Sequence, residues 1–280
     1  MPPAASPTDW RRRLSQAVGP LGTVRPLGND AWFVEAGGRT LVAKTGPGAR
    51  DEAGGLRQLG AVREGPPVPE VVFADDGLVV TVAVEQAPRT TDHEESLGHA
   101  LAALHATRLE HWGGGSSWIG NCHVDASTWP DGAAFYAARL GELAARCGLE
   151  DAVGRVVTRL HQLLPAGGPA LLHGDLWWGN VLFGADGRAW LIDPSVHGGH
   201  PEEDLAMLAL FGRVPDRLLA AYQEVSPLQP GWQERVALFQ LYPLLVHTVL
   251  FGEGYRSQAE AVARRFAGPT TYGRQRHGAS

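Results

Sequence analysis

The residues most able to do chemistry lie in the stretch His-Gly-Asp-Leu-Trp-Trp-Gly-Asn at 173–180, with a further aspartate, Asp193, beyond it. Asp175 and Asn180 have the Asp-to-Asn spacing of a kinase catalytic loop, in which the aspartate accepts the proton of the acceptor hydroxyl and the asparagine binds metal. The oxygens of Asn180 and Asp193 also suit Mg²⁺ that is shared with substrate phosphates. The stretch therefore indicates a phosphoryl-transfer site.

The segment between Asn180 and Asp193 has the pattern of a β-hairpin. Two apolar runs, 181–183 and 189–192, flank Asp186-Gly187, a dipeptide typical of two-residue turns. With that turn, Asn180 lies directly opposite Asp193, and paired residues of antiparallel strands have Cα atoms roughly 4.5 to 5.5 Å apart. The amide and the carboxylate would then be close enough to share one metal ion.

A surface hairpin after a polar turn would show the same spacing, because Asp-Gly turns are common and a single Asp-x4-Asn match arises easily by chance. Two further features favour the site. The apolar strand 170–172 leads directly into His-Gly-Asp, and the hairpin independently returns Asp193 to Asn180.

Lys44 is the one lysine among the 24 Lys and Arg residues of the chain. It ends the expected strand 40–44, which forms a hairpin with 31–35 around Gly37-Gly38, so it should lie beside the turn Gly28-Asn29-Asp30. A compact ammonium next to a loop that could cover phosphates suggests a phosphate-binding lysine, and chance retention of one lysine is the alternative. The glycines alone are a weak signal, since neither G-x-G-x-x-G nor G-x-x-x-x-G-K-[ST] occurs.

Two more segments could complete a nucleotide site. Glu52, in the expected helix 51–59, could reach back to Lys44 as the paired glutamate does in kinases, although spacing alone slightly favours a solvated helix charge. The polar turn Glu85-Gln86-Ala87 leaves the sheet region, and its backbone could hydrogen-bond an adenine edge as a hinge.

Hydrophobic periodicity and turn residues place these side chains on expected elements. We expect strands at 22–27, 31–35, 40–44, 71–74 and 78–85, helices at 9–18, 51–59, from 93 onward, 133–147, 151–164, 202–211 and 232–251, and loops at 112–130 and 194–201. His105 should have a packing or capping role. Residues 1–8 and the tail after 272 should be loosely ordered.

Composition limits the class of protein. A chain of 280 residues with 44% hydrophobic and 19% charged residues is ordinary for a globular protein. The net charge of -6 argues against nucleic acid or an anionic membrane as the main partner. Two cysteines make no disulfide framework, and no secretory leader or membrane-spanning run appears. We expect a cytoplasmic protein, with a monomer favoured.

The motifs resemble the fructosamine kinase (ketosamine-3-kinase) family, within the aminoglycoside phosphotransferase and protein-kinase-like superfamily. Residues 173–180 match its His-Gly-Asp-Leu-Trp-x-Gly-Asn signature. Residues 192–195 and 202–207 resemble its Ile-Asp-Pro-Ala and Glu-x-Asp-Leu-Ala-Met segments. Weaker matches lie at 52–56, 104–105, 240–242 and 251–252. The resemblance runs from about residue 20 to about residue 268.

The resemblance implies a fold and an activity. The fold is α+β and bilobal, protein-kinase-like, with a small antiparallel-sheet N-lobe carrying one main helix (1–86) and a larger, mostly helical C-lobe (87–280). The activity is transfer of the γ-phosphoryl group of ATP to the 3-hydroxyl of a ketosamine, a sugar amine formed by glycation, so that the adduct later falls off.

The resemblance also assigns roles. Asp175 would be the general base, and Asn180 and Asp193 the Mg²⁺ ligands. Lys44 would bind nucleotide phosphate with Glu52 as its partner. Further roles are implied for Asp204 and His173, which would support the catalytic loop, and for Glu85, Gln86 and Ala87, which would form the adenine hinge.

Aromatic residues could form the sugar pocket. Trp177, Trp178, Trp118 and His197 are the candidates, and core packing is an equally compatible role for the tryptophans. The chain departs from the family at two points. Its phosphate loop lacks the Gly-Gly-Cys-type sequence of many members, so redox control there is not expected, and Ser195 replaces the usual alanine with no clear consequence.

Other functions stay open. An aminoglycoside- or choline-type kinase would share the fold, but Trp177 and the Glu-x-Asp-Leu-Ala-Met run favour ketosamines. A catalytically inactive nucleotide-binding module is disfavoured because all four of Lys44, Asp175, Asn180 and Asp193 are present. A metallohydrolase built on His173, His197 and His200 would lack the helical H-E-x-x-H arrangement, and no G-x-S-x-G nucleophile elbow occurs.

Overall fold

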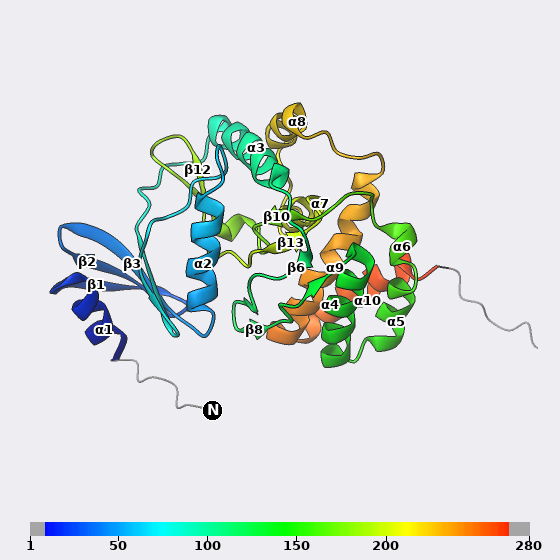
Figure 1. Cartoon of the computed structure of the whole chain (residues 1–280), viewed down its shortest axis with the longest axis horizontal. Coiled ribbons are helices and arrows are strands. Elements are labelled where there is room, and N and C mark those ends of the chain that lie inside the picture. Colours follow the sequence, from blue (N-terminus) through cyan, green and yellow to red (C-terminus); the bar gives the residue numbers. More distant parts are fainter. Residues whose placement is uncertain (1–8, 269–280) are drawn as a thin grey trace, which may run out of the picture.

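A five-stranded antiparallel sheet forms one end of the molecule in this computed structural model, which describes residues 9–268 (Figure 1). In spatial order its strands are β1 (Leu21–Gly28), β2 (Ala31–Ala36), β3 (Arg39–Thr45), β5 (Leu78–Val82) and β4 (Val71–Asp75). Helix α1 (Asp9–Val18) covers part of it through Trp10, which stacks on Trp32 with ring centroids 4.7 Å apart. Helix α2 (Ala49–Gly60) lies between the sheet and the rest of the chain.

Tight turns set the register around Lys44. Gly37 and Gly38, between β2 and β3, have φ angles of 57° and 75°, and Asn29 and Asp30, between β1 and β2, have φ angles of 49° and 55°. Such left-handed two-residue turns match the twist of the flanking strands. Lys44 pairs with Ala31, as the sequence predicted, and therefore lies beside the Asn29-Asp30 turn.

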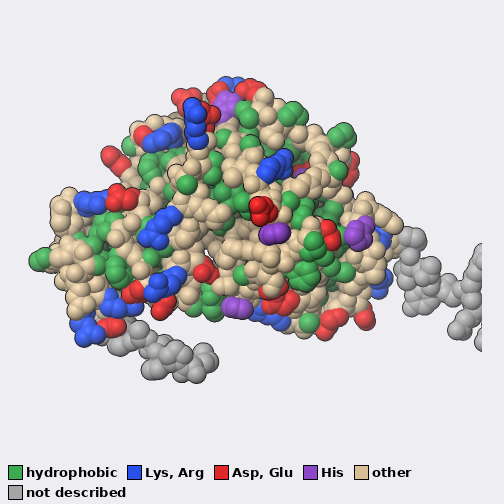
Figure 2. Space-filling model, viewed as in Figure 1, with side chains coloured by type: hydrophobic (Ala, Val, Ile, Leu, Met, Phe, Trp, Pro, Cys, Tyr) green, Lys and Arg blue, Asp and Glu red, His purple; other side chains and the backbone are tan. Residues whose placement is uncertain are grey.

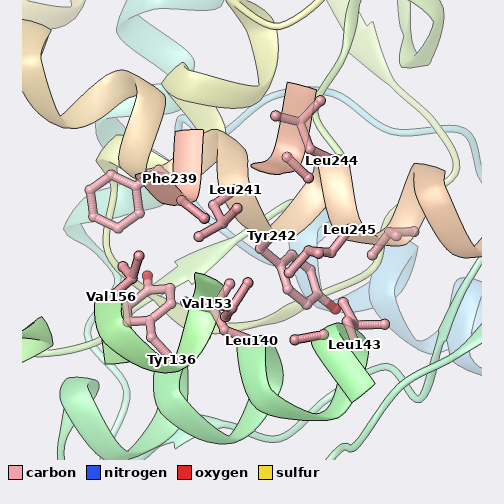
Figure 3. Packing of buried hydrophobic residues seen from close by; sticks show 14 of the residues in the cluster. Tyr136, Leu140, Leu143, Val153, Val156, Phe239, Leu241, Tyr242, Leu244 and Leu245 are labelled. Atoms are coloured by element: carbon pink, nitrogen blue, oxygen red, sulfur yellow. The ribbon is translucent and has the colours of Figure 1, made fainter. Parts of the chain in front are cut away.

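The larger lobe is built from eight helices in the described residues. They are α3 (Thr91–Ala106), α4 (Gly132–Cys147), α5 (Glu150–Val157), α6 (Leu160–Leu163), α7 (Glu202–Leu208), α8 (Asp216–Val225), α9 (Trp232–Phe251) and α10 (Glu253–Phe266). Figure 3 shows α9 presenting Phe239, Leu241 and Tyr242 to residues of α4 and α5. Because α9 is apolar nearly all round, it runs through the centre of this lobe.

Short strands carry the segments that the sequence marked as chemical. β10 (Ala170–Leu172), β13 (His197–Gly199), β6 (Trp112–Gly113) and β9 (Thr128–Trp129) form one sheet, and β7 (Trp118–Ile119) pairs with β8 (Cys122–His123). A 3₁₀ turn, Trp178–Asn180, leads into the hairpin β11 (Val181–Phe183) and β12 (Ala189–Leu191). β10 thus delivers His-Gly-Asp at its end, as predicted.

The predicted register of this hairpin is wrong by one residue. Gly184 N–H donates to the Arg188 carbonyl at 2.9 Å, so the loop has three residues, 185–187, and Gly187 has φ 78°. A three-residue loop of this kind, a turn followed by a left-handed bulge residue, is the next most common hairpin loop after the two-residue type. Asn180 consequently faces Ile192, whose N–H donates to its carbonyl at 3.1 Å, and Asp193 lies one residue beyond.

Several predicted element boundaries need correction. The single helix expected at 151–164 is broken at Thr158-Arg159 into α5 and α6, α7 ends at Leu208 rather than at residue 211, and β5 ends at Val82. Helices α8 and α10 were not predicted. The bilobal α+β architecture is confirmed, whereas the boundary between residues 86 and 87 stays a prediction. The expected loose ends, 1–8 and the tail after 272, lie outside the described residues.

On the face shown in Figure 2, acidic and basic side chains are interspersed. Within residues 9–268, no helix combines the length and the apolar character needed to cross a membrane. Cys122 and Cys147 are both free thiols.

Candidate active site

A cavity of about 470 Å³ lies where the end of the sheet and α2 meet the catalytic segments of the larger lobe. Lys44, Glu52, Asp175, Asn180 and Asp193 all line it. The structure therefore brings together the five polar residues that the sequence singled out for phosphoryl transfer, although they come from four separate parts of the chain.

Lys44 connects the two lobes electrostatically. Its Nζ lies 2.9 Å from Glu52 Oε2 of α2 and 2.9 Å from Asp193 Oδ2, which follows β12. Burial alone would lower the pKa of Lys44, but the two carboxylates outweigh burial and raise this pKa above its ordinary value. Lys44 is thus a fixed ammonium, and the predicted pairing with Glu52 is present.

Asp193 reaches this position through an unusual backbone conformation. Its φ of 53° lies in the left-handed region, which aspartate tolerates better than most residues. The chain therefore turns sharply just after the hairpin, and the carboxylate lies in the cavity beside Lys44 even though the register differs from the predicted one.

Asp175 is the buried acid of the site. Burial, and then the neighbouring Asp193, raise the pKa of Asp175 to about 7, against the opposing effects of Asn180 and Lys44. Asn180 Nδ2 donates to the Asp175 carbonyl at 2.8 Å and to Asp175 Oδ2 at 3.2 Å. A general base works best when its pKa lies near the operating pH, so this environment suits proton abstraction.

Asp204 holds the catalytic loop from behind. Its carboxylate accepts hydrogen bonds from His173 N at 2.8 Å, Gly174 N at 2.9 Å and His105 Nε2 at 3.2 Å. The Tyr222 hydroxyl in turn donates to His105 Nδ1 at 2.9 Å. Burial would raise the pKa of Asp204, but the contact with His105 holds this pKa below its ordinary value, so Asp204 is a charged acceptor.

His105 was expected only to pack or cap, and the chain of contacts from Tyr222 to Asp204 was not predicted. His173 also supports the loop: its Nε2 donates to the Ile192 carbonyl at 2.9 Å, and its Nδ1 accepts from Asp175 N at 3.3 Å. Burial lowers the pKa of His173, which keeps the ring neutral. The ring joins the loop of Asp175 to the segment that ends at Asp193.

The four residues proposed for the sugar pocket separate into two pairs. Trp118 and Trp177 line the cavity. Trp178 instead packs against buried hydrophobic residues of the larger lobe, with the Arg89 guanidinium 4.2 Å from its ring centroid. His197 is buried, 2.8 Å from Glu203 Oε1 and 2.9 Å from Arg139 Nη1. Neither the half-buried Trp178 nor the buried His197 lines the cavity, so the sugar-pocket role stays a proposal for Trp118 and Trp177.

Residues 85–87, the predicted adenine hinge, contact the β11–β12 hairpin. Ala87 N–H donates to the Phe183 carbonyl at 2.8 Å, the Glu85 carbonyl accepts from Ala185 N at 2.8 Å, and Gln86 pairs with Gly184. These two hydrogen bonds attach the β11–β12 hairpin through the Glu85 carbonyl and the Ala87 N–H. Residues 85–87 are not among the described residues that line the cavity, and their role as adenine hinge stays a proposal.

A loop of the larger lobe is attached directly to α2, a feature that the sequence did not reveal beyond its Gly-, Ser- and Trp-rich composition. Ser117 donates to Asp51 Oδ2 through its backbone N–H at 2.9 Å and its hydroxyl at 2.6 Å. Ser195 Oγ donates to the Trp118 carbonyl at 3.0 Å, which gives a role to the residue that replaces the usual alanine. A Cβ at Gly48 would lie 2.9 Å from Trp118 Cβ, so the loop packs closely on the start of α2.

The donor set at the cavity fits one kind of metal site. The Asn180 amide nitrogen is used by Asp175, which leaves Oδ1 free to bind a cation, and Asp193 adds a carboxylate. Within residues 9–268, no cluster of three or more His, Cys, Asp or Glu side chains could hold a metal ion. Two protein oxygens supplemented by phosphates and water suit Mg²⁺, whereas a metallohydrolase site is not formed.

Comparisons with known proteins agree with this arrangement. The model of the family described as fructosamine kinase matches residues 30–267. A probable ketoamine kinase of Thermus thermophilus is 37% identical over 243 residues, covering 84% of this chain and 90% of that protein. The crystal structure of a protein assigned as a fructosamine-3-kinase in Thermobifida fusca has a TM-score of 0.83 at 36% identity, covering 94% of this chain and 99% of that one.

A more distant structure shares the fold alone. The streptomycin–ATP complex of APH(2″)-IIa has a TM-score of 0.64 at 15% identity, covering 94% of this chain and 99% of that one.

Proposed function

The chain belongs to the fructosamine kinase family, and on that premise we propose that it transfers the γ-phosphoryl group of ATP to the 3-hydroxyl of ketosamines, with Asp175 as the general base. The acceptor is a small sugar amine or glycated amine. The reaction marks the adduct for removal, so the protein acts in deglycation.

One observation of the structure carries the assignment of residues. Lys44 lies 2.9 Å from both Glu52 and Asp193, in the same cavity as Asp175 and Asn180. Protein kinases need the lysine–glutamate pair and the metal-binding aspartate in place together for transfer. An inactive nucleotide-binding module would not be required to keep all five groups in this arrangement.

The residues divide the reaction between them. Asp175 takes the proton from the acceptor hydroxyl, whose oxygen then forms the new bond to the γ-phosphorus while the bond to the β,γ-bridging oxygen of ATP breaks. Lys44 binds the nucleotide phosphates, with Glu52 fixing its position. Asn180 and Asp193 would hold Mg²⁺, which when bound neutralises phosphate charge. Asp204 and His173 hold the loop that carries Asp175.

Phosphate transfer from ATP to a panel of acceptors tests the proposal. The panel contains fructosamines, ribulosamines and erythrulosamines, with aminoglycosides and choline as controls. We expect phosphorylation of ketosamines, loss of activity when Mg²⁺ is chelated, and restoration when Mg²⁺ is added back. Phosphorylation of an aminoglycoside or of choline in preference to every ketosamine would replace the substrate assignment.

Four earlier expectations remain proposals beside this one. They are the lobe boundary between residues 86 and 87, the adenine-hinge role of residues 85–87, a monomeric state and a cytoplasmic location. None of them is needed for the chemistry.

A further inference from the structure

Five aromatic side chains are in mutual contact at one side of the cavity. We call this cluster, Trp177, Phe211, His247, Phe251 and Tyr255, the aromatic rim. The ring centroids of neighbouring members lie between 5.0 and 6.3 Å apart. The members come from the catalytic loop, the segment after α7, α9 and α10. Segments distant in sequence thus converge to form one aromatic surface.

The rim is exposed in a way that core residues are not. Phe251 is 66% exposed, Phe211 43% and Trp177 39%. Among residues 9–268, the other large hydrophobic side chains with comparable exposure are Leu27 and Val225, on β1 and α8. Of the five exposed large hydrophobic side chains, the three that belong to the rim therefore gather in one patch. Such clustering indicates a binding surface more than scattered exposure does.

The rim is continuous with the cavity on its acceptor side. Trp177, His247 and Phe251 line the cavity together with Asp175. The phosphate-binding groups approach from the other lobe, where Lys44 of β3 and the Asn29 turn line the same cavity. An acceptor that places its hydroxyl at Asp175 and avoids the nucleotide has the rim within reach of its remaining part.

The rim offers ring faces and no fixed charge. Burial lowers the pKa of His247, and its Nδ1 donates to the Pro243 carbonyl at 2.7 Å, so the ring is neutral near pH 7. Aromatic faces attract ammonium groups through their quadrupole and bury apolar groups favourably. A ketosamine carries, beyond its sugar, a protonated secondary amine with one organic substituent, and this combination matches the rim.

We propose that the aromatic rim binds the amine half of the acceptor and makes the enzyme selective for ketosamines whose nitrogen carries a benzyl-type or long alkyl group. The ammonium lies against the ring faces, and the substituent covers Phe251 and Phe211. This inference rests on the proposed kinase activity and names a finer substrate class for the same site.

The size of the patch favours a free small-molecule adduct as the occupant. Five side chains suffice for one substituent, whereas a stable protein–protein contact buries about 800 Å² on each partner. The remaining exposed large hydrophobic residues lie on other elements and do not extend the rim. A folded glycated protein would therefore find little apolar surface around it.

A matched pair of substrates tests the rim. N-methyl and N-benzyl fructosamine share the sugar and the ammonium and differ only in the group that the rim would cover. We expect kcat/KM to be about tenfold or more higher for the benzyl compound, the effect of burying a side chain of aromatic size. Phe251→Ser and Phe211→Ser should each reduce this ratio about 3- to 10-fold, mainly through KM for the benzyl compound.

Val225→Ser is the matched control, because Val225 is an exposed hydrophobic residue on α8 outside the rim, and it should leave the ratio unchanged. Equal kcat/KM for the two compounds in the wild type, or equal losses for both in Phe251→Ser, would contradict the proposed role of the rim while leaving the kinase assignment intact. Absence of turnover with every ketosamine would overturn both. Light scattering of the same variants completes the test: a dimer that Phe251→Ser dissociates would make the patch a self-association surface instead.

Discussion

Lys44 shows how a single residue type can be required by its surroundings. Its ammonium lies 2.9 Å from two carboxylates on different lobes, in a space that the chain's other basic residue type, arginine, would fill differently. A guanidinium is planar, larger and more weakly hydrated than an ammonium, so it cannot occupy the same point between Glu52 and Asp193. The contacts explain the retention of one lysine better than chance does.

Lys44→Arg tests this reading at the residue scale. We expect kcat/KM for ATP to fall about 10- to 100-fold, the equivalent of losing one well-placed hydrogen bond to a charged group, although the charge is kept. Steady-state kinetics at varied ATP provide the measurement, and thermal unfolding checks that the fold is intact. Wild-type kinetics in this variant would reduce the lone lysine to a coincidence.

Residue types predicted the catalytic residues of the site but not all of the contacts between its side chains. Residue types and spacing identified Lys44, Asp175, Asn180 and Asp193, because these positions need particular chemistry. Spacing could not say that His197 is turned inward to Glu203, since that depends on backbone turns in a Gly-rich segment. The contact between His105 and Asp204 was not predicted because the two residues are far apart in the sequence.

Among the elements, the loop that carries Ser117 and Trp118 joins the lobes. Ser117 makes two hydrogen bonds to Asp51 of α2, the helix that also carries Glu52, and Trp118 lines the cavity. The loop therefore fixes the helix that positions the partner of Lys44. Disturbing it should affect substrate binding more than the stability of either lobe.

Ser117→Ala removes one of these hydrogen bonds and leaves the backbone contact. We expect KM for ATP to rise about 3- to 10-fold, the net contribution of one typical hydrogen bond, because the backbone contact to the same carboxylate remains. Ser127→Ala is the control: Ser127 also donates from its N–H and its hydroxyl to one aspartate, Asp125, but within a single exposed turn. Equal effects of the two variants on KM would show that the contact with α2 does not matter.

Elements were predictable where local pattern decides them. The strands around Lys44 follow from alternating residues and two-residue turns, α4 follows from apolar periodicity, and α9 follows from a long, mostly apolar run. The β11–β12 register was missed because Asp186-Gly187 is compatible with loops of two or three residues, which differ by one position in every pair. The short strands β6 to β9 were missed because each has only two residues and depends on tertiary contacts.

At the scale of the whole molecule, buried neutral histidines couple stability to pH. Burial lowers the pKa of His200 to about 3 from an ordinary value of 6.5. The unfolded chain therefore binds a proton in the window between pH 6.5 and pH 3 that the folded chain does not. Lowering the pH through this window should reduce the free energy of unfolding.

His200→Asn tests the sign and size of this coupling. Asparagine keeps a hydrogen-bond acceptor for Glu202 N but does not titrate in the window. Denaturant unfolding at several pH values measures the free energy of unfolding. Between pH 6 and pH 4 this free energy should fall less steeply in the variant than in the wild type, and the difference in slope should correspond to up to about one bound proton. Identical slopes would mean that His200 is protonated alike in both states.

The bilobal architecture was predictable from the resemblance to the family and from the order of the elements. The catalytic residues lie where the two lobes meet. The way the lobes are joined was not predictable, since it depends on contacts such as Asp51 with Ser117 that have no local signature. Helices α8 and α10, which were not predicted, complete the larger lobe by packing on α3 and α9.

The account depends most on Asp175 acting as the base in a site whose nucleotide contacts lie elsewhere. The direct measurement compares ATP affinity and phosphate transfer to a ketosamine in wild type and Asp175→Asn. Asparagine has nearly the same shape, so we predict unchanged ATP affinity and folding, with transfer slowed about 100- to 10,000-fold, the range for loss of a general base. Transfer at a near-normal rate in a variant that still binds ATP would contradict the account.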